Sequence, residues 1–121
     1  MIANDPRIEE VLKRGETIDI TTTGRKTGQP RTVELVYHNV DGQIVLSGRP
    51  GFPRGWVANL LADPRMTFHL KRTVTADLSA SGRVITDRAE RERLLEPIAR
   101  LWRVDRAVMV ASAPLVEVTF D

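Results

Sequence analysis

The segment from Thr23 to Arg31 has the clearest potential for chemistry in this sequence. It places Arg25, Lys26 and Arg31 around two glycines. Runs typical of β-strands precede and follow it, so we expect the segment to form the tip of a hairpin. A glycine-containing tip can turn backbone N–H groups and cationic side chains toward one bound anion. A solvated turn would also explain this pattern, and the surrounding charges favour anion binding.

The positive excess of the chain lies around this tip. Between residues 20 and 62 there are five arginines and lysines but only two acids, Glu34 and Asp41, whereas the rest of the chain has 13 bases and 14 acids. One face of an otherwise balanced molecule should therefore attract anions. Most of the cations in this window are arginines, whose planar guanidinium suits phosphate or carboxylate better than an ammonium does.

The composition is that of an ordinary soluble globular domain. The chain has 121 residues, of which 41% are hydrophobic and 28% charged, which leaves room for a single domain over residues 1–121. The lack of cysteine excludes disulfides, thiolate metal sites and cysteine nucleophiles. No apolar run approaches the roughly 18 residues of a membrane span, and there is no apolar signal core at the N-terminus. We therefore expect a cytoplasmic protein without a transmembrane segment.

The hydrophobic pattern predicts six strands and three or four short helices. Apolar residues alternate with polar ones near residues 18–21, 33–38, 66–71, 74–80 and 116–120, which is typical of half-buried strands. The Asp41-Gly42 pair is a hairpin turn signal that predicts a further strand at residues 44–47. Helices are expected after Asp5-Pro6, from Trp56 to Pro64, and after Asp87, with Pro97 bending the last helix or starting another. These elements do not form βαβ units. They favour a mainly β (α+β) fold, a small closed or nearly closed antiparallel barrel with helices in its connections.

The side chains offer no obvious catalytic group of their own. Gly24 to Gly28 lacks the Gly-Lys-Ser/Thr ending of a phosphate-binding P-loop. His38 and His69 alternate with apolar neighbours and are expected on outward strand faces, so no metal site is predicted. The sequence contains neither a Gly-x-Ser-x-Gly elbow nor a pair of acids of the kind that glycosidases use. Any redox or transfer chemistry must therefore come from a cofactor.

A cofactor site would need an anion clamp, a flat apolar wall and a helix N-terminus. Ser47, Gly48 and Arg49 end one predicted strand, and Arg54 and Gly55 precede the helix that begins near Trp56. The first N–H groups of such a helix are free to bind a phosphate or a ring carbonyl. On residue type alone, Trp56 also suits the core, and Asn59 suits the helix surface.

Three segments together resemble the deazaflavin-dependent nitroreductase family, whose members are split-β-barrel flavin/deazaflavin oxidoreductases that use coenzyme F420. They are residues 20–31, Asp41-Gly42 and residues 55–64, and the resemblance extends over roughly residues 17 to 102. It implies a six-stranded antiparallel split β-barrel of the FMN-binding type. It also implies an enzyme that transfers a hydride between reduced deazaflavin and a small organic acceptor, such as a quinone, an enone or a nitro compound.

The resemblance also implies site residues. The positions that match the family's cofactor-binding motifs are Arg25, Lys26, Thr27, Arg31, Ser47, Gly48, Arg49, Arg54, Gly55, Trp56 and Asn59. Val36 and Tyr37 would line the substrate pocket. Family members that reduce bulky nitro compounds or quinones have several tyrosines there, whereas this chain has one, so the acceptor is left open. The cofactor carries the reaction, and no side chain is assigned as catalytic.

Three alternatives remain beside the F420-dependent oxidoreductase. One is an FMN-dependent enzyme on the same barrel, because a similar cationic clamp can hold its phosphate. Another is a non-catalytic carrier of an apolar ligand. The third, a small barrel that binds nucleic acid, is disfavoured by a net charge of only +2 and an aromatic content of 5%. The protein is expected to be a monomer or a homodimer.

Overall fold

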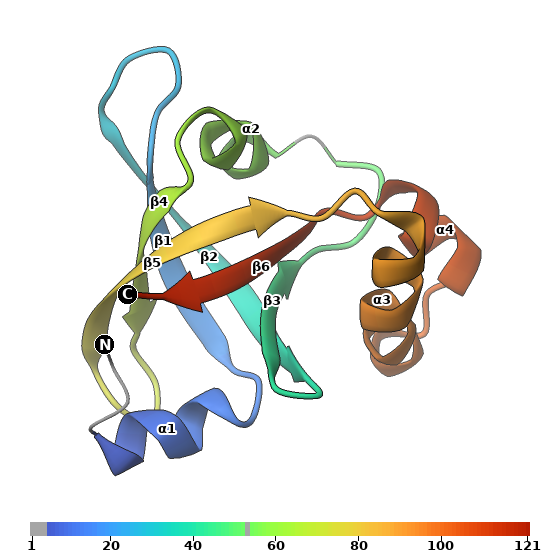
Figure 1. Cartoon of the computed structure of the whole chain (residues 1–121), viewed down its shortest axis with the longest axis horizontal. Helices are drawn as coiled ribbons and strands as arrows, with labels where there is room; N and C mark the ends of the chain where they lie inside the picture. Colours follow the sequence, from blue (N-terminus) through green and yellow to red (C-terminus); the bar gives the residue numbers. More distant parts are fainter. Residues whose placement is uncertain (1–4, 53) are drawn as a thin grey trace.

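The computed structural model describes residues 5–52 and 54–121. Within them the chain forms six strands and four helices (Figure 1). The strands are β1 (Thr17–Thr23), β2 (Pro30–Val40), β3 (Gln43–Ser47), β4 (Arg65–Leu70), β5 (Ala76–Val84) and β6 (Leu115–Phe120). The helices are α1 (Pro6–Leu12), α2 (Gly55–Ala62), α3 (Arg88–Trp102) and α4 (Arg106–Ser112).

The six strands close into one antiparallel barrel. Their order is β1-β2-β3-β6-β5-β4, and β4 pairs with β1 to complete the ring. Alternate residues point inward along each strand, which buries Ile18 and Ile20 of β1 and Phe68 and Leu70 of β4. The predicted six-stranded antiparallel barrel with short helices is confirmed.

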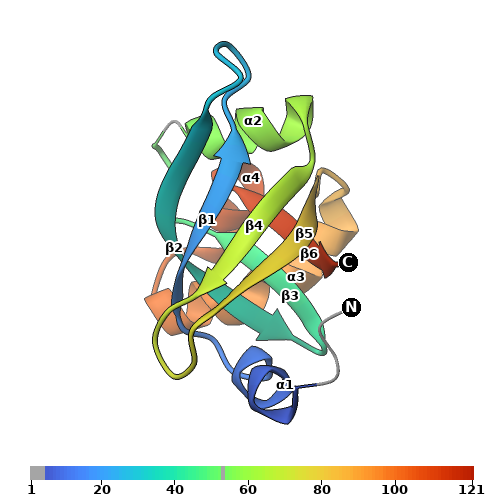
Figure 2. The same cartoon turned by 90° about the vertical axis from the view of Figure 1, so that its left-hand side faces the viewer.

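Two helices cover opposite ends of the barrel (Figures 1 and 2). Val11 and Leu12 of α1 pack into the core at one end, and Trp56 and Leu60 of α2 pack into it at the other. Asp5 accepts a hydrogen bond from the Arg7 N–H and caps α1, which begins where the sequence predicts. The ends of the barrel are therefore filled by apolar side chains, and its interior is a packed core.

Helices α3 and α4 form a second apolar cluster outside the barrel. Leu94, Leu95 and Ile98 of α3 pack with Met109 of α4 and with the outward-facing Val45 of β3. Helix α3 runs through Pro97 on its exposed face, so no second helix starts there. In the part of the chain that the structure describes, no helix is long and apolar enough to span a membrane.

The β1–β2 hairpin extends beyond the barrel at the end covered by α2. Its strands pair from Thr17 and Val36 to Thr23 and Pro30, and its tip projects past α2 (Figures 1 and 2). Of the residues of β2, only 37–40 pair with β3. Residues 30–36 of β2 therefore pair with β1 on one side and, among the described residues, with no strand on the other. This open edge forms one wall of the candidate site.

Candidate functional site

A groove of about 660 Å³ lies between the hairpin tip, the open edge of β2 and the start of α2. It contains most of the cations that the sequence predicts for anion binding. Eight of the eleven predicted cofactor-binding residues line it: Arg25, Lys26, Thr27, Arg31, Arg54, Gly55, Trp56 and Asn59. Because these residues come from two separate connections of the barrel, the fold brings together what is dispersed along the chain.

Three predicted cofactor-binding residues do not line the groove. The Ser47 side chain is buried, and its hydroxyl donates to the carbonyl of Pro114 at 2.7 Å. The guanidinium of Arg49 lies 5.5 Å from the centre of the Trp102 ring, on α3. Gly48 lies behind Arg54 and contacts its side chain.

The structure does not bring Val36 and Tyr37 to the groove. Tyr37 is fully buried in the barrel, where its hydroxyl donates to the Val11 carbonyl at 2.6 Å and burial raises its pKa. Val36 points outward and lines a separate cavity beneath α3. The apolar wall of the groove comes instead from Val33 and Leu35. Both lie on the same inward face of β2 as Tyr37. Unlike Tyr37, they lie in the part of β2 that does not pair with β3, so they line the open edge.

Asn59 connects α2 to the hairpin tip. Its side-chain oxygen accepts hydrogen bonds from the Arg25 backbone N–H at 3.1 Å and from the Arg25 guanidinium at 3.0 Å. Its amide nitrogen donates to the hydroxyl of Thr22 at 3.1 Å. Asn59 is only 5% exposed, so it is a buried connector and does not lie on the helix surface. It fixes the backbone of the tip and one of the groove cations.

Arg54 lies at the other side of the groove, at the N-cap position of α2. Its guanidinium donates to the Phe52 carbonyl at 2.8 Å and lies 5.7 Å from the centre of the Phe52 ring. Burial lowers the pKa of Arg54, because desolvation disfavours the charged form. Among the described residues, no side chain caps the N-terminus of α2. Its first N–H groups are therefore available to a ligand beside Gly55 and Trp56.

The groove cations keep their charge uncompensated. In the described ranges, no carboxylate forms an ion pair with Arg25, Lys26, Arg31 or Arg54. Glu34 also lines the groove, but its carboxylate binds Lys71. A groove with several unpaired cations attracts anionic ligands and raises their local concentration.

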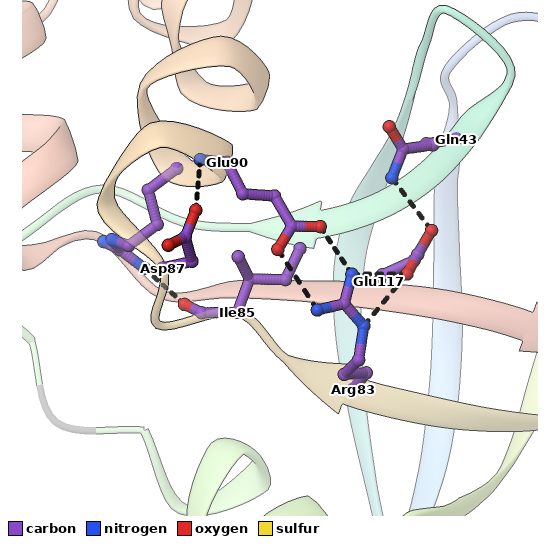
Figure 3. Close-up of polar contacts among 7 residues, drawn as sticks. Gln43, Arg83, Ile85, Asp87, Glu90 and Glu117 are labelled. Carbon is purple, nitrogen blue, oxygen red and sulfur yellow. Dashed lines mark hydrogen bonds and ion pairs between the residues drawn. The ribbon is translucent and has the colours of Figure 1, made fainter.

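Arg83 shows the opposite arrangement on another face of the barrel (Figure 3). It lies on β5, and its guanidinium donates to Glu117 of β6 at 2.7 and 3.1 Å and to Glu90 of α3 at 3.1 Å. Gln43 donates to the same Glu117 carboxylate at 2.9 Å. These bonds lower the pKa of both glutamates, and the cluster joins β3, β5, β6 and α3 with no positive charge left over for an anionic ligand.

Several groove residues were not predicted from the sequence. They are Thr22, Gly24, Thr32, Val33, Glu34, Leu35 and Phe52. The alternation of Val33 and Leu35 with polar neighbours was a usable signal, since it places both on the inward face. Phe52 is 67% exposed in a loop rich in glycine and proline, and an exposed aromatic residue beside a cationic tip is a second signal of this kind.

Comparison with curated proteins gives a short but clear match. A segment of 46 residues is 46% identical to the F420H(2)-dependent quinone reductase Rv1261c of Mycobacterium tuberculosis (strain ATCC 25618 / H37Rv). A protein of Mycobacterium bovis named as an F420H(2)-dependent quinone reductase, Mb1292c, matches to the same extent. Each match covers 36% of this chain and 31% of the relative, so it spans about a third of the length of these relatives.

Solved structures share the fold over nearly the whole chain. General Stress Protein 26 from Bacillus anthracis str. Sterne aligns with a TM-score of 0.69 at 10% identity, covering 95% of this chain and 87% of that one. An F420-H2 dependent reductase, FDR-A, aligns with a TM-score of 0.60 at 21% identity, covering 85% and 93%. At these identities the likeness shows the fold alone, and it agrees with the predicted split β-barrel.

The family model matches nearly the whole chain. Residues 3–116 match the model described as F420H(2)-dependent quinone reductase. The match includes the hairpin tip, the open edge of β2 and helix α2, which together form the groove. The resemblance to F420-using split-barrel oxidoreductases noted in the sequence is thereby confirmed: the chain belongs to the F420H(2)-dependent quinone reductase family.

Proposed function

We propose that this protein is an F420-dependent reductase that binds the coenzyme in the groove and passes a hydride to a quinone-type acceptor. Family membership supports the cofactor and the type of reaction. The observation that carries the proposal is the groove itself, in which four cations that pair with no carboxylate of residues 5–52 and 54–121 lie beside an apolar wall. This combination fits a planar redox ring that bears an anionic tail.

The donor set of the groove agrees with such a ligand. Lys26 and Arg31 from the hairpin and Arg54 from the loop before α2 would hold phosphate and carboxylate groups, because guanidinium and ammonium groups form strong charge-assisted bonds with them. The uncapped start of α2 would add backbone N–H donors. Trp56, Val33 and Leu35 supply the apolar surface that a flat ring requires.

Reduced F420 supplies a hydride from carbon C5 of its deazaflavin ring. The protein residues would then position the two reactants and exclude water. Val33, Leu35 and Trp56 provide a low-dielectric wall in which nearby charges act more strongly. Arg25 would stabilise the negative charge that develops on an acceptor oxygen, and it needs little rearrangement because its guanidinium is already hydrogen-bonded to Asn59.

The apolar wall favours a neutral, flat acceptor such as a quinone. Phe52 is exposed at the groove and offers a further aromatic surface for it. The only tyrosine of the chain is buried in the barrel. A tyrosine hydroxyl is therefore not available to bind the acceptor, and shape and apolar contact would select it instead.

Titration of the purified protein with F420 and with FMN, followed by fluorescence, tests the cofactor. We expect saturable binding of F420 and weaker binding of FMN. Absence of a saturable change with F420, or tighter binding of FMN, would contradict the proposal. Reduced F420 is then mixed with menadione, cyclohexenone or nitrobenzene, and its oxidation is followed by absorbance. We expect the fastest oxidation with menadione, whereas an apolar ligand that co-purifies without any turnover would favour a carrier.

A further inference from the structure

Gly48 and Arg54 approach each other more closely than a side chain at position 48 would allow. A Cβ atom built on Gly48 would lie 2.5 Å from Nη2, 2.8 Å from Nε and 2.9 Å from Cζ of Arg54. Real Cβ atoms do not come this close to other heavy atoms. The guanidinium therefore occupies space that exists only because position 48 has no side chain.

The backbone conformation of Gly48 gives no other reason for a glycine. Gly28, Gly42 and Gly51 have positive φ angles of 73°, 88° and 94° and have open space where a Cβ would lie. Those three glycines are explained by their turns. Gly48 has no positive φ, so an alanine could adopt its backbone conformation without strain. What an alanine would change at this position is the place of Arg54.

The other contacts of Arg54 hold it without neutralising it. The Phe52 carbonyl accepts one hydrogen bond at 2.8 Å, and the Phe52 ring lies 5.7 Å away. No carboxylate reaches Arg54 in the described part of the chain. A cation fixed by neutral groups retains its attraction for an anion and loses little side-chain freedom when the anion binds.

We infer that Gly48 is a positioning residue whose missing side chain allows the Arg54 guanidinium to lie in the groove wall, where it binds the anionic part of the cofactor. This inference rests on the proposed function of the groove. It gives Gly48 a role different from the direct cofactor contact expected from the sequence. It also explains why Gly48 is absent from the groove lining while Arg54 is part of it.

A double-mutant cycle tests this role through binding. Gly48→Ala and Arg54→Ala should each weaken F420 binding about tenfold, the typical loss of one charge-assisted hydrogen bond. The double variant should bind as Arg54→Ala does, because the new methyl group then has no guanidinium to displace. Additive losses, or unchanged binding by Gly48→Ala, would overturn the inference. The melting temperature of Gly48→Ala should stay close to that of the wild type, because the methyl group meets only the far end of a flexible side chain.

A second measurement does not depend on the cofactor. In the ligand-free protein, the ¹⁵N NMR signal of the Arg54 side-chain Nε–H should show restricted motion in the wild type and fast motion in Gly48→Ala. Equal motion in both proteins would overturn the inference. If the wild type fails to bind F420, the proposed function fails, while this comparison still decides whether Gly48 positions Arg54. A fall in melting temperature that Arg54→Ala does not reverse would show that Gly48 serves packing instead.

Discussion

Arg83 and the arginines of the groove are held by opposite kinds of partner. Two glutamates surround Arg83 (Figure 3), whereas the Asn59 amide oxygen binds Arg25 and the Phe52 carbonyl binds Arg54. Carboxylates fix a guanidinium and also cancel its charge, whereas amide and carbonyl oxygens fix it without doing so. The same residue type therefore joins secondary-structure elements on one face and remains available to an anionic ligand on another.

The largest effect is expected when the neutral partner of Arg25 is removed. Asn59→Leu leaves the Arg25 backbone N–H and the buried Thr22 hydroxyl without their partner, and each unsatisfied buried group costs roughly 1–3 kcal/mol. We expect the free energy of unfolding to fall by about 2 kcal/mol in urea denaturation. F420 binding should weaken as well, since the tip loses its connection to α2. Wild-type stability in Asn59→Leu would show that this connection contributes nothing.

Asn59→Asp would give Arg25 a carboxylate as its partner, as Arg83 has. The new carboxylate can still accept from Arg25, and the Thr22 hydroxyl can donate to it, so unfolding should change little. It would, however, neutralise a groove cation, and we expect F420 binding to weaken about tenfold, which corresponds to about 1.4 kcal/mol. Fluorescence titration beside urea denaturation separates the two effects. Tight binding by Asn59→Asp would contradict the importance of uncompensated charge.

Lys26 and Arg49 offer a matched pair of cations inside and outside the groove. Lys26 lines the groove, whereas Arg49 lies over the Trp102 ring. Lys26→Ala should weaken F420 binding about fivefold, an effect that decreases as salt increases. Arg49→Ala should leave binding unchanged and lower stability by about 0.5 kcal/mol, the typical value of an exposed cation–π contact. A loss of binding in Arg49→Ala would return Arg49 to the cofactor site, as the sequence predicted.

The smallest effect is expected at Arg83. Arg83→Ala should leave F420 binding unchanged and lower the free energy of unfolding by about 0.5 kcal/mol, since its ion pairs are partly exposed. The hydrogen bonds from Gln43 and Arg83 lower the pKa of Glu117, and those from Arg83 lower the pKa of Glu90. Their stabilisation is therefore present above about pH 4.5 and is lost as the pH falls through the lowered values. Thermal unfolding from pH 6 to pH 3 should show a shallower loss in Arg83→Ala, and an identical profile would exclude this linkage.

The barrel and the cationic tip could be predicted because both are local signals. Period-2 alternation places Val33, Leu35 and Tyr37 on one face, and the structure agrees. Alternation does not tell where a neighbouring strand begins, however. The pairing of β3 with β2 ends at Tyr37, opposite Leu46, so Tyr37 lies in the core, whereas Val33 and Leu35 lie beyond this pairing and reach the groove.

Residues whose environment depends on distant segments could not be placed from the sequence. His38 points outward, as predicted, but α3 covers it, so it is buried against Trp102 and its Nε2 has no hydrogen-bond partner among the described residues. Burial lowers its pKa. Arg49 is predicted for the cofactor site, yet its guanidinium lies over the Trp102 ring of α3. Residues 1–121 as one domain, a cytoplasmic location and a monomer or homodimer stay predictions.

The bond from the Arg25 backbone N–H to Asn59 makes this one amide a reporter of the separation between the hairpin and α2. Its hydrogen exchanges with solvent deuterium when this bond breaks, as it does when the two segments part. The exchange rate of this single site, followed by NMR, therefore measures how often the groove opens, and a ligand that bridges both walls should slow it.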